Sequence, residues 1–573
     1  MRILILHHAN DAIAGPWNTR GKWDLCLDLG AAGQSSYAAW SERLGCPVEP
    51  AGRLATGDFE RIRECLGYGG RGLVDQHGLD WWDLISFEFH QQIEEIARLQ
   101  SVAAKLDSRD GIYITRSGFQ SRVLSLLTGH ETFCFSNRAG FQKSVRHYAQ
   151  VISRFSLDEL LQITADKYDS GYRLRRLFNK RPKKLSRPVV LLPSAYVNVS
   201  RTELQYAEML PDVDFLLIAT RDSALNAAAA ENVKVAKLAS YARRDDNQGE
   251  FASLLGRWNQ LRPEMMRQEL LSVLIRSGVL DSFPVFLQNG LRIRDAWLRV
   301  FRQQPVCAVF CADDANLPTR IPLAIAVTRG LPAISCHHGA LDGRYRIRPP
   351  RDWPVLAKGQ MERDYLVREC QVGAENVRLG APRRSPPHRT GSSREPSLVV
   401  FFSEPYELVG ARCSEFYREV LPPLAEVTAS AGRKLVLKLH PMESLRERES
   451  VAVSVLSDSV RGVLQVVSGP LRDELLNQTW FAVTVASTIA VDCTLSGIPV
   501  FLCEWLDYSR YGYLQQFVKF GAGTALKSAS CIHDIPQMLE RFQRKSAADL
   551  WQTITPERLR ELLGQRVSMA AAG

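Results

Sequence analysis

The sequence predicts an α/β protein with two Rossmann-like lobes that face a cleft, the N-terminal lobe being enlarged by helical insertions. Three observations predict this class. Short apolar runs alternate with helical stretches, which is the pattern of a parallel sheet with helices between its strands. One segment rich in Pro, Ser, Gly and Arg separates two such series. The length of 573 residues gives room for two or three domains.

The domain boundary is predicted at residues 383–396, because a chain of that composition should be extended and solvated. The predicted domains are an N-terminal lobe, residues 1–382, which we expect on the acceptor side, and a C-terminal lobe, residues 397–573. The C-terminal lobe is expected to bind the nucleotide donor.

The composition is that of an ordinary soluble enzyme, with 45% hydrophobic and 23% charged residues. No run approaches the ~18 apolar residues that a membrane span needs. The first residues become polar after four apolar positions, so they predict a strand and not a secretory signal. We therefore expect a cytoplasmic protein, or one held peripherally on the cytoplasmic face of the inner membrane.

The net charge of +10 suits an anionic donor, an anionic polymer or an acidic membrane surface. No DNA or RNA motif accompanies the charge, so no nucleic-acid partner is expected. The 12 cysteines are scattered without a CxxC pair or zinc-ligand spacing, which predicts reduced, buried thiols and no metal site.

The C-terminal lobe shows five apolar runs with helical stretches between them. The predicted strands are residues 398–402, 434–439, 463–467, 480–485 and 498–503. Polar residues at the carboxyl ends of parallel strands, each opening a helix, are typical of an anion site.

Two of these strand ends predict a phosphate site. Lys438 and His440 alternate on one strand, so their side chains point the same way, and Pro441 follows. Ser487 and Thr488 follow the strand 480–485 and precede a helix of small residues. The competing interpretation is a solvated strand end. Glu504, just beyond the strand 498–503, is expected to hydrogen-bond ribose hydroxyls.

The N-terminal lobe is longer and less regular. Its predicted strands are residues 2–6, 25–29, 111–115, 189–192, 215–219, 308–311 and 333–336. Helices are predicted at 81–106, at 156–178, where Ser156 and Glu159 form a capping box, and over most of 245–303. Apolar residues at core-like spacing in that last stretch are Trp258, Leu270, Leu271, Leu274 and Trp297.

Two neighbouring strand ends of this lobe concentrate polar side chains. Asp313, Asp314 and Asn316 follow the strand 308–311, and a loop from His337 to Asp342 follows the strand 333–336. A packed core would not tolerate such groups unpaired. The alternative is structural: the aspartates cap a helix, and Gly339 only makes the turn.

A general base is predicted among these loops. His338 and Asp342 are the first candidates, because they lie beside flexible glycines. His8 is the other candidate, since it should end the first strand of the same sheet. Histidine suits this work because its unperturbed pKa is near ~6.5.

These motifs resemble those of a known superfamily. Lys438-Leu-His440-Pro441 resembles the His-Pro motif of bacterial sialyltransferases, polysialyltransferases and CDP-glycerol glycerophosphotransferases, and Ser487-Thr488 resembles their Ser-Ser/Thr motif. His338-Gly339 and Gly380-Ala-Pro382-Arg383 are similar to the "HG … G-x-PR" pattern of the same superfamily. The resemblance implies a GT-B glycosyltransferase fold, with the histidine and the hydroxyl pair on the donor phosphate and the base in the N-terminal lobe. Asp313-Asp314-Ala departs from the sialyltransferase Asp/Glu-Asp/Glu-Gly motif at the glycine.

The predicted function is transfer of a sugar, or a polyol phosphate, from a nucleotide-activated donor to a hydroxyl acceptor. The acceptor is expected to be a glycan or a lipid-linked glycan in the synthesis of capsule or another surface polysaccharide. We expect an inverting enzyme that needs neither a cofactor nor a metal, since no spaced Asp-x-Asp clamp is evident. Two alternatives stay open: a catalytically silent protein that binds a glycan or nucleotide, and a sugar-nucleotide epimerase.

Overall fold

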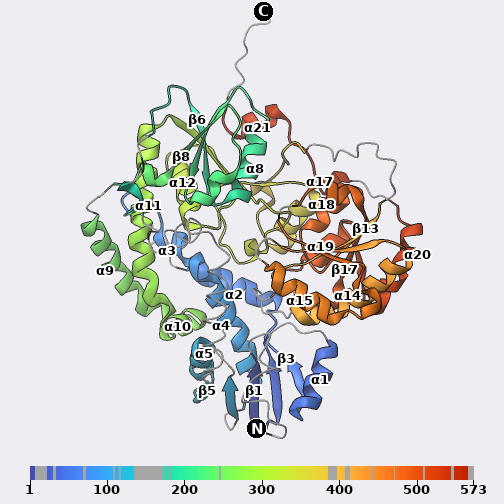
Figure 1. Cartoon of the computed structure of the whole chain (residues 1–573). Helices are drawn as coiled ribbons and strands as arrows, with labels where there is room; N and C mark the ends of the chain where they lie inside the picture. The colour runs from blue at the N-terminus through green and yellow to red at the C-terminus, as the bar shows by residue number, and fades with distance from the viewer. Residues whose placement is uncertain are drawn as a thin grey trace, which may run out of the picture. The chain divides into compact units, whose positions relative to one another are not determined.

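The computed structural model describes residues 1–6, 22–29, 34–68, 72–107, 110–114, 118–134, 169, 172, 174–177, 179, 182–243, 247–384, 396–406, 413–440, 443–469, 471–507, 510–543 and 547–565. These residues form three parallel sheets of five, seven and six strands in two compact units (Figure 1). Unit 1 consists of Met1–Leu54, Arg98–Asn137 and Ser385–Trp551, and unit 2 of Ala55–Ala97, Arg138–Arg384 and Gln552–Gly573.

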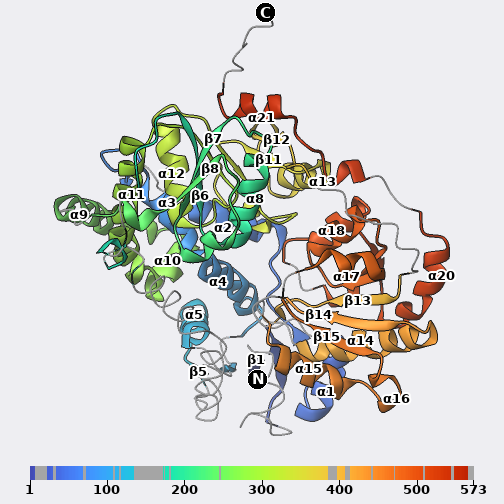
Figure 2. The same ribbon diagram turned by 45° about the horizontal axis from the view of Figure 1, so that its top comes forward.

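Unit 2 is built on the seven-stranded sheet, in the order β12-β11-β10-β9-β6-β7-β8. Its strands are β6 (Val189–Ser194), β7 (Asp214–Ala219), β8 (Val233–Lys237), β9 (Val306–Cys311), β10 (Ala333–Cys336), β11 (Val355–Ala357) and β12 (Val377–Leu379). Every residue of the interior strand β6 is buried, as expected of a parallel strand covered on both faces. The helices α8 (Val197–Ala207) and α12 (Leu317–Thr328) pack along the sheet (Figure 2).

The strand order of this sheet reverses once. From β6 the chain adds β7 and β8 on one side, and then returns to place β9 on the other side of β6. The loops that follow β6 and β9 therefore leave in opposite directions. Ligands bind doubly wound sheets at such a switch point, outside the carboxyl ends of the strands.

A helical insertion enlarges unit 2, as the sequence predicted. It contains α9 (Gln248–Met265), α10 (Glu269–Arg276) and α11 (Phe283–Gln303). The aromatic rings of Trp82, Trp258 and Phe283 stack here, with centroids 5.8 Å apart for the two tryptophans and 4.0 Å for Trp258 and Phe283. The predicted core positions of this stretch are all buried.

The helix predicted at 81–106 is confirmed in three consecutive pieces: α3 (Trp81–Ile85), a 3-10 turn (Ser86–Phe89) and α4 (His90–Ala103). Most of the helix predicted at 156–178 lies outside the described residues.

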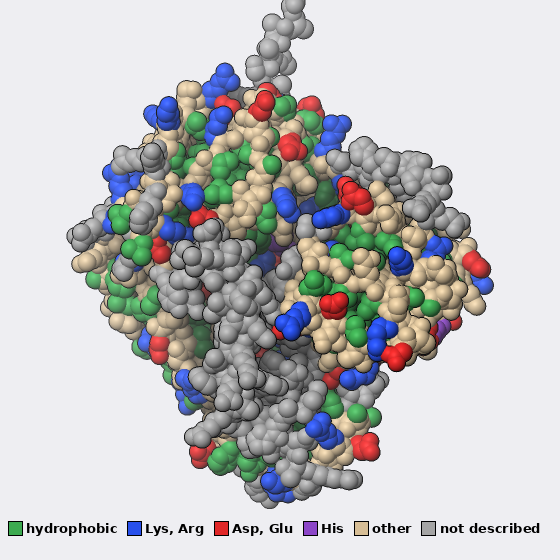
Figure 3. Space-filling view, in the orientation of Figure 1, with side chains coloured by type: hydrophobic (Ala, Val, Ile, Leu, Met, Phe, Trp, Pro, Cys, Tyr) green, Lys and Arg blue, Asp and Glu red, His purple; other side chains and the backbone are tan. Residues whose placement is uncertain are grey.

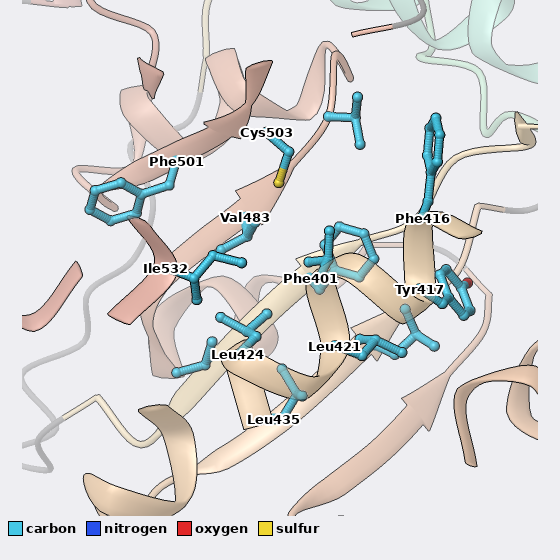
Figure 4. Packing of buried hydrophobic residues seen from close by; sticks show 14 of the residues in the cluster. Phe401, Phe416, Tyr417, Leu421, Leu424, Leu435, Val483, Phe501, Cys503 and Ile532 are labelled. Atoms are coloured by element: carbon cyan, nitrogen blue, oxygen red, sulfur yellow. The ribbon is translucent and has the colours of Figure 1, made fainter. Parts of the chain in front are cut away.

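The six-stranded sheet of unit 1 has the order β15-β14-β13-β16-β17-β18. Its strands are β13 (Leu398–Phe402), β14 (Lys434–Lys438), β15 (Leu464–Val467), β16 (Thr479–Thr484), β17 (Val500–Cys503) and β18 (Thr524–Leu526). The order reverses between β13 and β16, so this sheet has a switch point of its own. Leu421 and Leu424 of α14 (Cys413–Ser430) pack on Phe401 and Val483 of the strands (Figure 4).

The third sheet was not predicted as a separate body. It has the order β3-β2-β1-β4-β5 and belongs to unit 1. Its strands are β1 (Arg2–Leu6), β2 (Leu25–Asp28), β3 (Val48–Pro50), β4 (Gly111–Ile114) and β5 (Thr132–Cys134). The prediction that β1 and β10 share a sheet is therefore wrong. Each of these strands pairs only with its neighbours in the five-stranded sheet.

The two compact units differ in extent from the predicted domains 1–382 and 397–573. The division between Arg384 and Ser385 falls in the expected linker, of which residues 385–395 lie outside the described part. However, the first 54 residues group with unit 1, and residues 552–573 group with unit 2. The second change has a visible cause. Thr553 bridges to Ala381, and Ile554, Leu559 and Leu563 join the apolar core around β6 and β9.

No single helix in the described part of the chain combines the length and apolar character of a membrane span; the helices Glu269–Arg276 and Val279–Gln303, bent by 69°, do so only when joined. On the face shown in Figure 3, basic and acidic side chains are interspersed. The net charge of +10 is not gathered into one patch on that face.

Leu559 on α21 (Pro556–Leu562) tests whether the C-terminal segment completes the core of unit 2. Leu559→Ala should lower the free energy of unfolding by about 2–5 kcal/mol, because the side chain is buried against the seven-stranded sheet. Urea unfolding measures it. Arg558→Ala, which removes only an exposed ion pair with Glu561, is the control and should cost no more than about 1 kcal/mol. Equal losses in the two variants would contradict the assignment.

Candidate functional site

The carboxyl ends of β6, β9 and β10 bring four polar side chains together in unit 2. Tyr196 follows β6, Asp313 follows β9, and His337 and His338 follow β10. The three strands are neighbours in the sheet, and the switch point lies between the first two. The side chains sequence analysis singled out after β9 and β10 thus lie where a doubly wound sheet binds ligands.

Asp313 is the centre of the hydrogen bonds at this edge. Its carboxylate is 1% exposed and accepts from the Tyr196 hydroxyl at 2.8 Å, from the Ala315 amide at 2.9 Å and from the Asn316 side chain. Burial, and then the charge of Asp313, raises the pKa of Tyr196 far above its usual value. The phenol therefore keeps its proton and acts as a donor at neutral pH.

His338 lies against this pair. Its ring meets the Tyr196 ring edge-on, with centroids 5.4 Å apart, and lies 4.3 Å from the ring of His337. Its Nδ1 is buried and makes no hydrogen bond among the described residues. Burial lowers the pKa of His338; the charges of Lys358 and Arg344 lower it further, against an opposing effect of Asp313. The imidazole is therefore neutral at neutral pH and can accept a proton.

Lys358, which follows β11, holds the loop that carries His338 through hydrogen bonds to its backbone. The Lys358 ammonium donates to the backbone carbonyls of His337 and Gly339. The Gly339 amide donates to Nδ1 of His337 at 3.2 Å, and a Cβ on Gly339 would lie 3.0 Å from that ring. The backbone of Gly339 therefore lies close to the His337 ring and fixes that ring beside His338.

Asp342 was predicted as a base, and the structure shows it occupied by two guanidinium groups. Arg344 donates to both of its oxygens, at 2.8 and 3.1 Å, and Arg348 donates to it at 2.9 Å. Burial raises the pKa of Asp342, but the charges of Arg344 and Arg348 outweigh it and hold the pKa well below its usual range. A carboxylate this acidic is a weak base, so its place in the site is that of an anchor.

Asp314 completes the same set of charges. It pairs with Arg348 and accepts from the Tyr345 hydroxyl at 3.3 Å and the Trp353 indole at 3.4 Å. Burial opposes its ionisation, but the surrounding guanidinium groups lower its pKa overall. Asp314 therefore does not cap the following helix, as the structural alternative expected, but is bound by side chains of the loop after β10.

Sequence analysis missed Tyr196, Arg344 and two glutamates at this edge. Glu203 on α8 is fully buried and accepts from the Ala312 amide at 3.1 Å; burial raises its pKa well above the usual value. Glu88 accepts from the Leu317 amide at 3.3 Å, and burial raises its pKa against the attraction of Arg320. Only Tyr196 carried a local signal, since it directly follows the apolar run of β6.

The predicted phosphate residues lie at the carboxyl edge of the six-stranded sheet in unit 1. Thr488 precedes α18 (Ile489–Leu495), and its hydroxyl does not cap that helix. Ser487 accepts weakly from the Ile489 amide at 3.4 Å, and both residues are half-buried. At the switch point beside them, Glu404 accepts from the Thr484 hydroxyl and the Ala486 amide, each at 3.1 Å. Ser487 and Thr488 thus lie half-buried at this edge, and neither caps α18 by a strong side-chain hydrogen bond.

Lys438 and His440 lie at the same edge, but β13 separates their strand from β16. Lys438 is 5% exposed and donates to the carbonyls of Leu439 at 2.9 Å and Gly469 at 2.6 Å, which leaves one of its three N–H groups. Burial, and then the charge of Lys438, lowers the pKa of His440. The His440 amide donates to Glu443 at 2.8 Å.

The structure describes only one of the three other predicted site residues, Glu504, Pro441 and His8. Glu504 forms an ion pair with Lys527, 2.6 Å from each oxygen, at the ends of β17 and β18. Pro441 and His8 lie outside the described residues. Because β1 belongs to the five-stranded sheet, the reason for grouping His8 with His338 no longer applies. Across the described ranges, no group of three or more His, Cys, Asp or Glu side chains is arranged to hold a metal ion.

No protein-family model matches the chain, and neither does any curated protein. Among solved structures, it is similar to the UDP-GlcNAc 2-epimerase of Methanocaldococcus jannaschii, with 11% identity, a TM-score of 0.42 and coverage of 66% of this chain and 99% of that one. A glycosyltransferase of Rickettsia africae matches with 9% identity, a TM-score of 0.39 and coverage of 66% and 94%. MurG of Acinetobacter baumannii matches with 9% identity, a TM-score of 0.37 and coverage of 66% and 100%. No activity of this chain follows from likenesses at these TM-scores.

Asp342→Asn tests the anchoring role of the carboxylate. At pH 7 it should lower the free energy of unfolding by about 3 kcal/mol, because it leaves buried positive charge without its partner. The folded-state pKa of Asp342 lies below the unfolded value of ~3.9, so the parent's advantage is complete above that pH. The advantage is lost as pH falls through the folded pKa.

Urea unfolding at a series of pH values measures this difference. The gap between parent and Asp342→Asn should narrow as the pH falls below about 4. Asp281→Asn, at an exposed ion pair with Arg262, is the control and should show little gap at any pH. A gap that stays constant down to pH 2 would show that ionisation of Asp342 is not what stabilises the loop.

Proposed function

We propose that this protein transfers a sugar, or a polyol phosphate, from a nucleotide-activated donor to a hydroxyl acceptor. The observation that carries the proposal is Nδ1 of His338, a buried ring nitrogen that makes no hydrogen bond among the described residues. Its imidazole has a lowered pKa and follows β10, next to the switch point between β9 and β6. A buried polar atom without a partner costs roughly 1–3 kcal/mol. A ring held in that state by Lys358, Tyr196 and His337 is suited to take a proton from a substrate, which a silent binding protein has no need to do.

In the proposed reaction His338 is the catalytic residue. The acceptor hydroxyl gives its proton to Nδ1 of His338 as its oxygen bonds to the donor's anomeric carbon. The bond from that carbon to the donor phosphate breaks, and the nucleotide leaves with the electron pair. Asp313 raises the pKa of His338, so its charge favours the imidazolium that forms. Tyr196 donates a hydrogen bond to the Asp313 carboxylate and holds it in place beside His338.

The donor nucleotide is assigned to the carboxyl edge of the six-stranded sheet. The hydroxyls of Ser487 and Thr488 and the side chain of His440 are the proposed phosphate contacts, and Lys438 has one N–H group left to add. Such donors stabilise a departing phosphate without a metal. Glu504 can meet ribose hydroxyls while paired with Lys527, because a carboxylate has about four acceptor sites.

The finer parts of the proposal rest on the sequence motifs. The His-Pro and Ser-Thr motifs favour an inverting enzyme of surface-polysaccharide synthesis, acting on a glycan or lipid-linked acceptor. Lys438 and His440 before Pro441, with Ser487-Thr488, are the residues that favour it.

His338→Ala should lower kcat by about 10²–10⁴-fold while leaving nucleotide affinity intact, because it removes only the proton acceptor. The assay uses the full chain with EDTA present, since the proposal needs no metal. His533→Ala, at an exposed histidine of unit 1, is the control. In the parent, kcat/KM should fall as the pH drops through the lowered pKa of His338, because the protonated ring cannot act as a base.

Near-normal turnover of His338→Ala would remove the catalytic assignment. Conversion of the donor sugar with no acceptor present would instead identify an epimerase.

The donor site is tested by binding. A thermal-shift panel of CMP, CDP, UDP, GDP and TDP first identifies the nucleotide, because a ligand at a hundred times its Kd adds about 2.7 kcal/mol of stability. The double variant Ser487→Ala/Thr488→Ala and the variant His440→Ala should then each bind that nucleotide more weakly. The loss in binding free energy should be roughly 1.5–3 kcal/mol per lost charge-assisted contact. Ser457→Ala/Ser459→Ala removes two exposed hydroxyls that precede β15 and should change nothing. Unchanged affinity in the first two variants would place the phosphate elsewhere.

A further inference from the structure

Unit 2 has a second polar pocket, of about 410 Å³, at the opposite edge of the seven-stranded sheet from His338. Two of its walls are the ends of α11 and α12, which lead into the amino ends of β9 and β10. Its lining includes His77, Asn247, Arg294, Arg299, Arg302 and Arg329. Because the switch point lies at the carboxyl ends of the strands, the pocket is distinct from the site proposed for catalysis.

Three carboxylates surround Arg294 beside this pocket, so its single positive charge offsets only one of their three formal negative charges. Arg294 pairs with Asp75 at 2.7 Å, with Glu250 at 2.7 Å and with Asp295 at 2.6 Å. Asn247 also donates to Asp295, at 3.3 Å. Asp75, Glu250 and Asp295 thus bring three formal negative charges against the four guanidinium groups of Arg294, Arg299, Arg302 and Arg329. The pocket and its surroundings therefore keep an excess of one positive charge.

The remaining arginines gather positive charge on one wall. Arg299 is 7% exposed and donates to the Tyr241 carbonyl at 3.0 Å. Burial, and then the charges of Arg243 and Arg302, lowers the pKa of Arg299 to about 10. Arg302 and Arg329 are exposed, and neither pairs with a carboxylate in the described part of the chain. Arg329 lies over the ring of Phe301, 5.1 Å from its centroid.

The ends of the two helices explain part of this arrangement. Arg302 lies in the last turn of α11 and Arg329 caps α12, where a helix carries partial negative charge. That effect is worth only about 0.3–1 kcal/mol at an exposed site. The helix dipole explains why each of these two arginines lies at a helix end. It does not explain why three guanidinium groups line the same pocket.

We propose that this pocket binds a hydroxylated small molecule that carries an oxyanion, as a sugar phosphate or an acidic sugar does. Guanidinium groups match phosphate and carboxylate oxygens in a two-pronged geometry. Gln76, His77 and Asn247 supply side-chain groups that can meet hydroxyls beside the anion. The volume suits a small organic ligand rather than a bare ion.

Calorimetric titration of the full chain tests the pocket with four probes: glucose 6-phosphate, glucuronate, glucose and inorganic phosphate. One of the two anionic sugars should bind more tightly than glucose and more tightly than inorganic phosphate. The double variant Arg302→Ala/Arg329→Ala should raise the Kd of that probe by about tenfold or more. Both residues are exposed, so the fold is kept. Arg267→Ala/Arg276→Ala removes the same charge from exposed positions outside the pocket and should leave binding unchanged.

Two further variants separate this pocket from the proposed transfer reaction. Ser487→Ala/Thr488→Ala and His338→Ala should not change the affinity for the anionic sugar. Loss of binding in either would assign the probe to the reaction site. Failure of every probe, or an equal effect of the two double arginine variants, would overturn the pocket and leave the proposed function untouched.

Discussion

The ion pairs of Arg348 are the interaction on which the candidate site of unit 2 depends. Its guanidinium joins Asp314, which follows β9, to Asp342, which follows β10. All three side chains are about 2–3% exposed. Charges so far from water persist only when they are paired, so the two loops cannot separate without a cost of several kcal/mol. Asp313 and His338 lie on these two loops, and the buried charges fix the distance between them.

The same topology builds two different edges from one plan. Both larger sheets are parallel and reverse their strand order once, so polar residues at their carboxyl ends gather at a switch point. In unit 2 this edge carries an imidazole nitrogen that no described residue hydrogen-bonds, near the fixed carboxylate of Asp313. In unit 1 it carries the half-buried Ser487 and Thr488 and a buried glutamate, Glu404, that ties the loops after β13 and β16 together. Proton transfer suits the first edge and oxyanion binding suits the second.

Most of the buried charged side chains discussed above make hydrogen bonds or ion pairs that hold the fold together. Lys438 and Lys358 both donate N–H groups to backbone carbonyls at strand ends. Two arginines bind Asp342, and three carboxylates bind Arg294. From residue type and sequence position alone, each of these side chains would be a candidate catalytic or binding residue. His338 differs from them because its Nδ1 has no hydrogen-bond partner among the described residues, which can be seen only when the neighbours are known.

The sequence alone was enough to predict the strands of both doubly wound sheets, apart from the short or polar strands β8, β11, β12 and β18. It also predicted the α/β class, the helical insertion and the strand-end loops that hold Asp313, His338, Ser487 and Thr488. These depend on local pattern: an apolar run of four to six residues predicts a buried strand wherever it pairs. The tertiary structure decided which strands share a sheet, since parallel strands pair through long crossovers that leave no local mark. It placed β1 in a third sheet and brought Leu559 back to unit 2. It also decided that Asp342 is an anchor and Tyr196 a donor, because a side chain's pKa and partners depend on burial and on charges distant in the sequence.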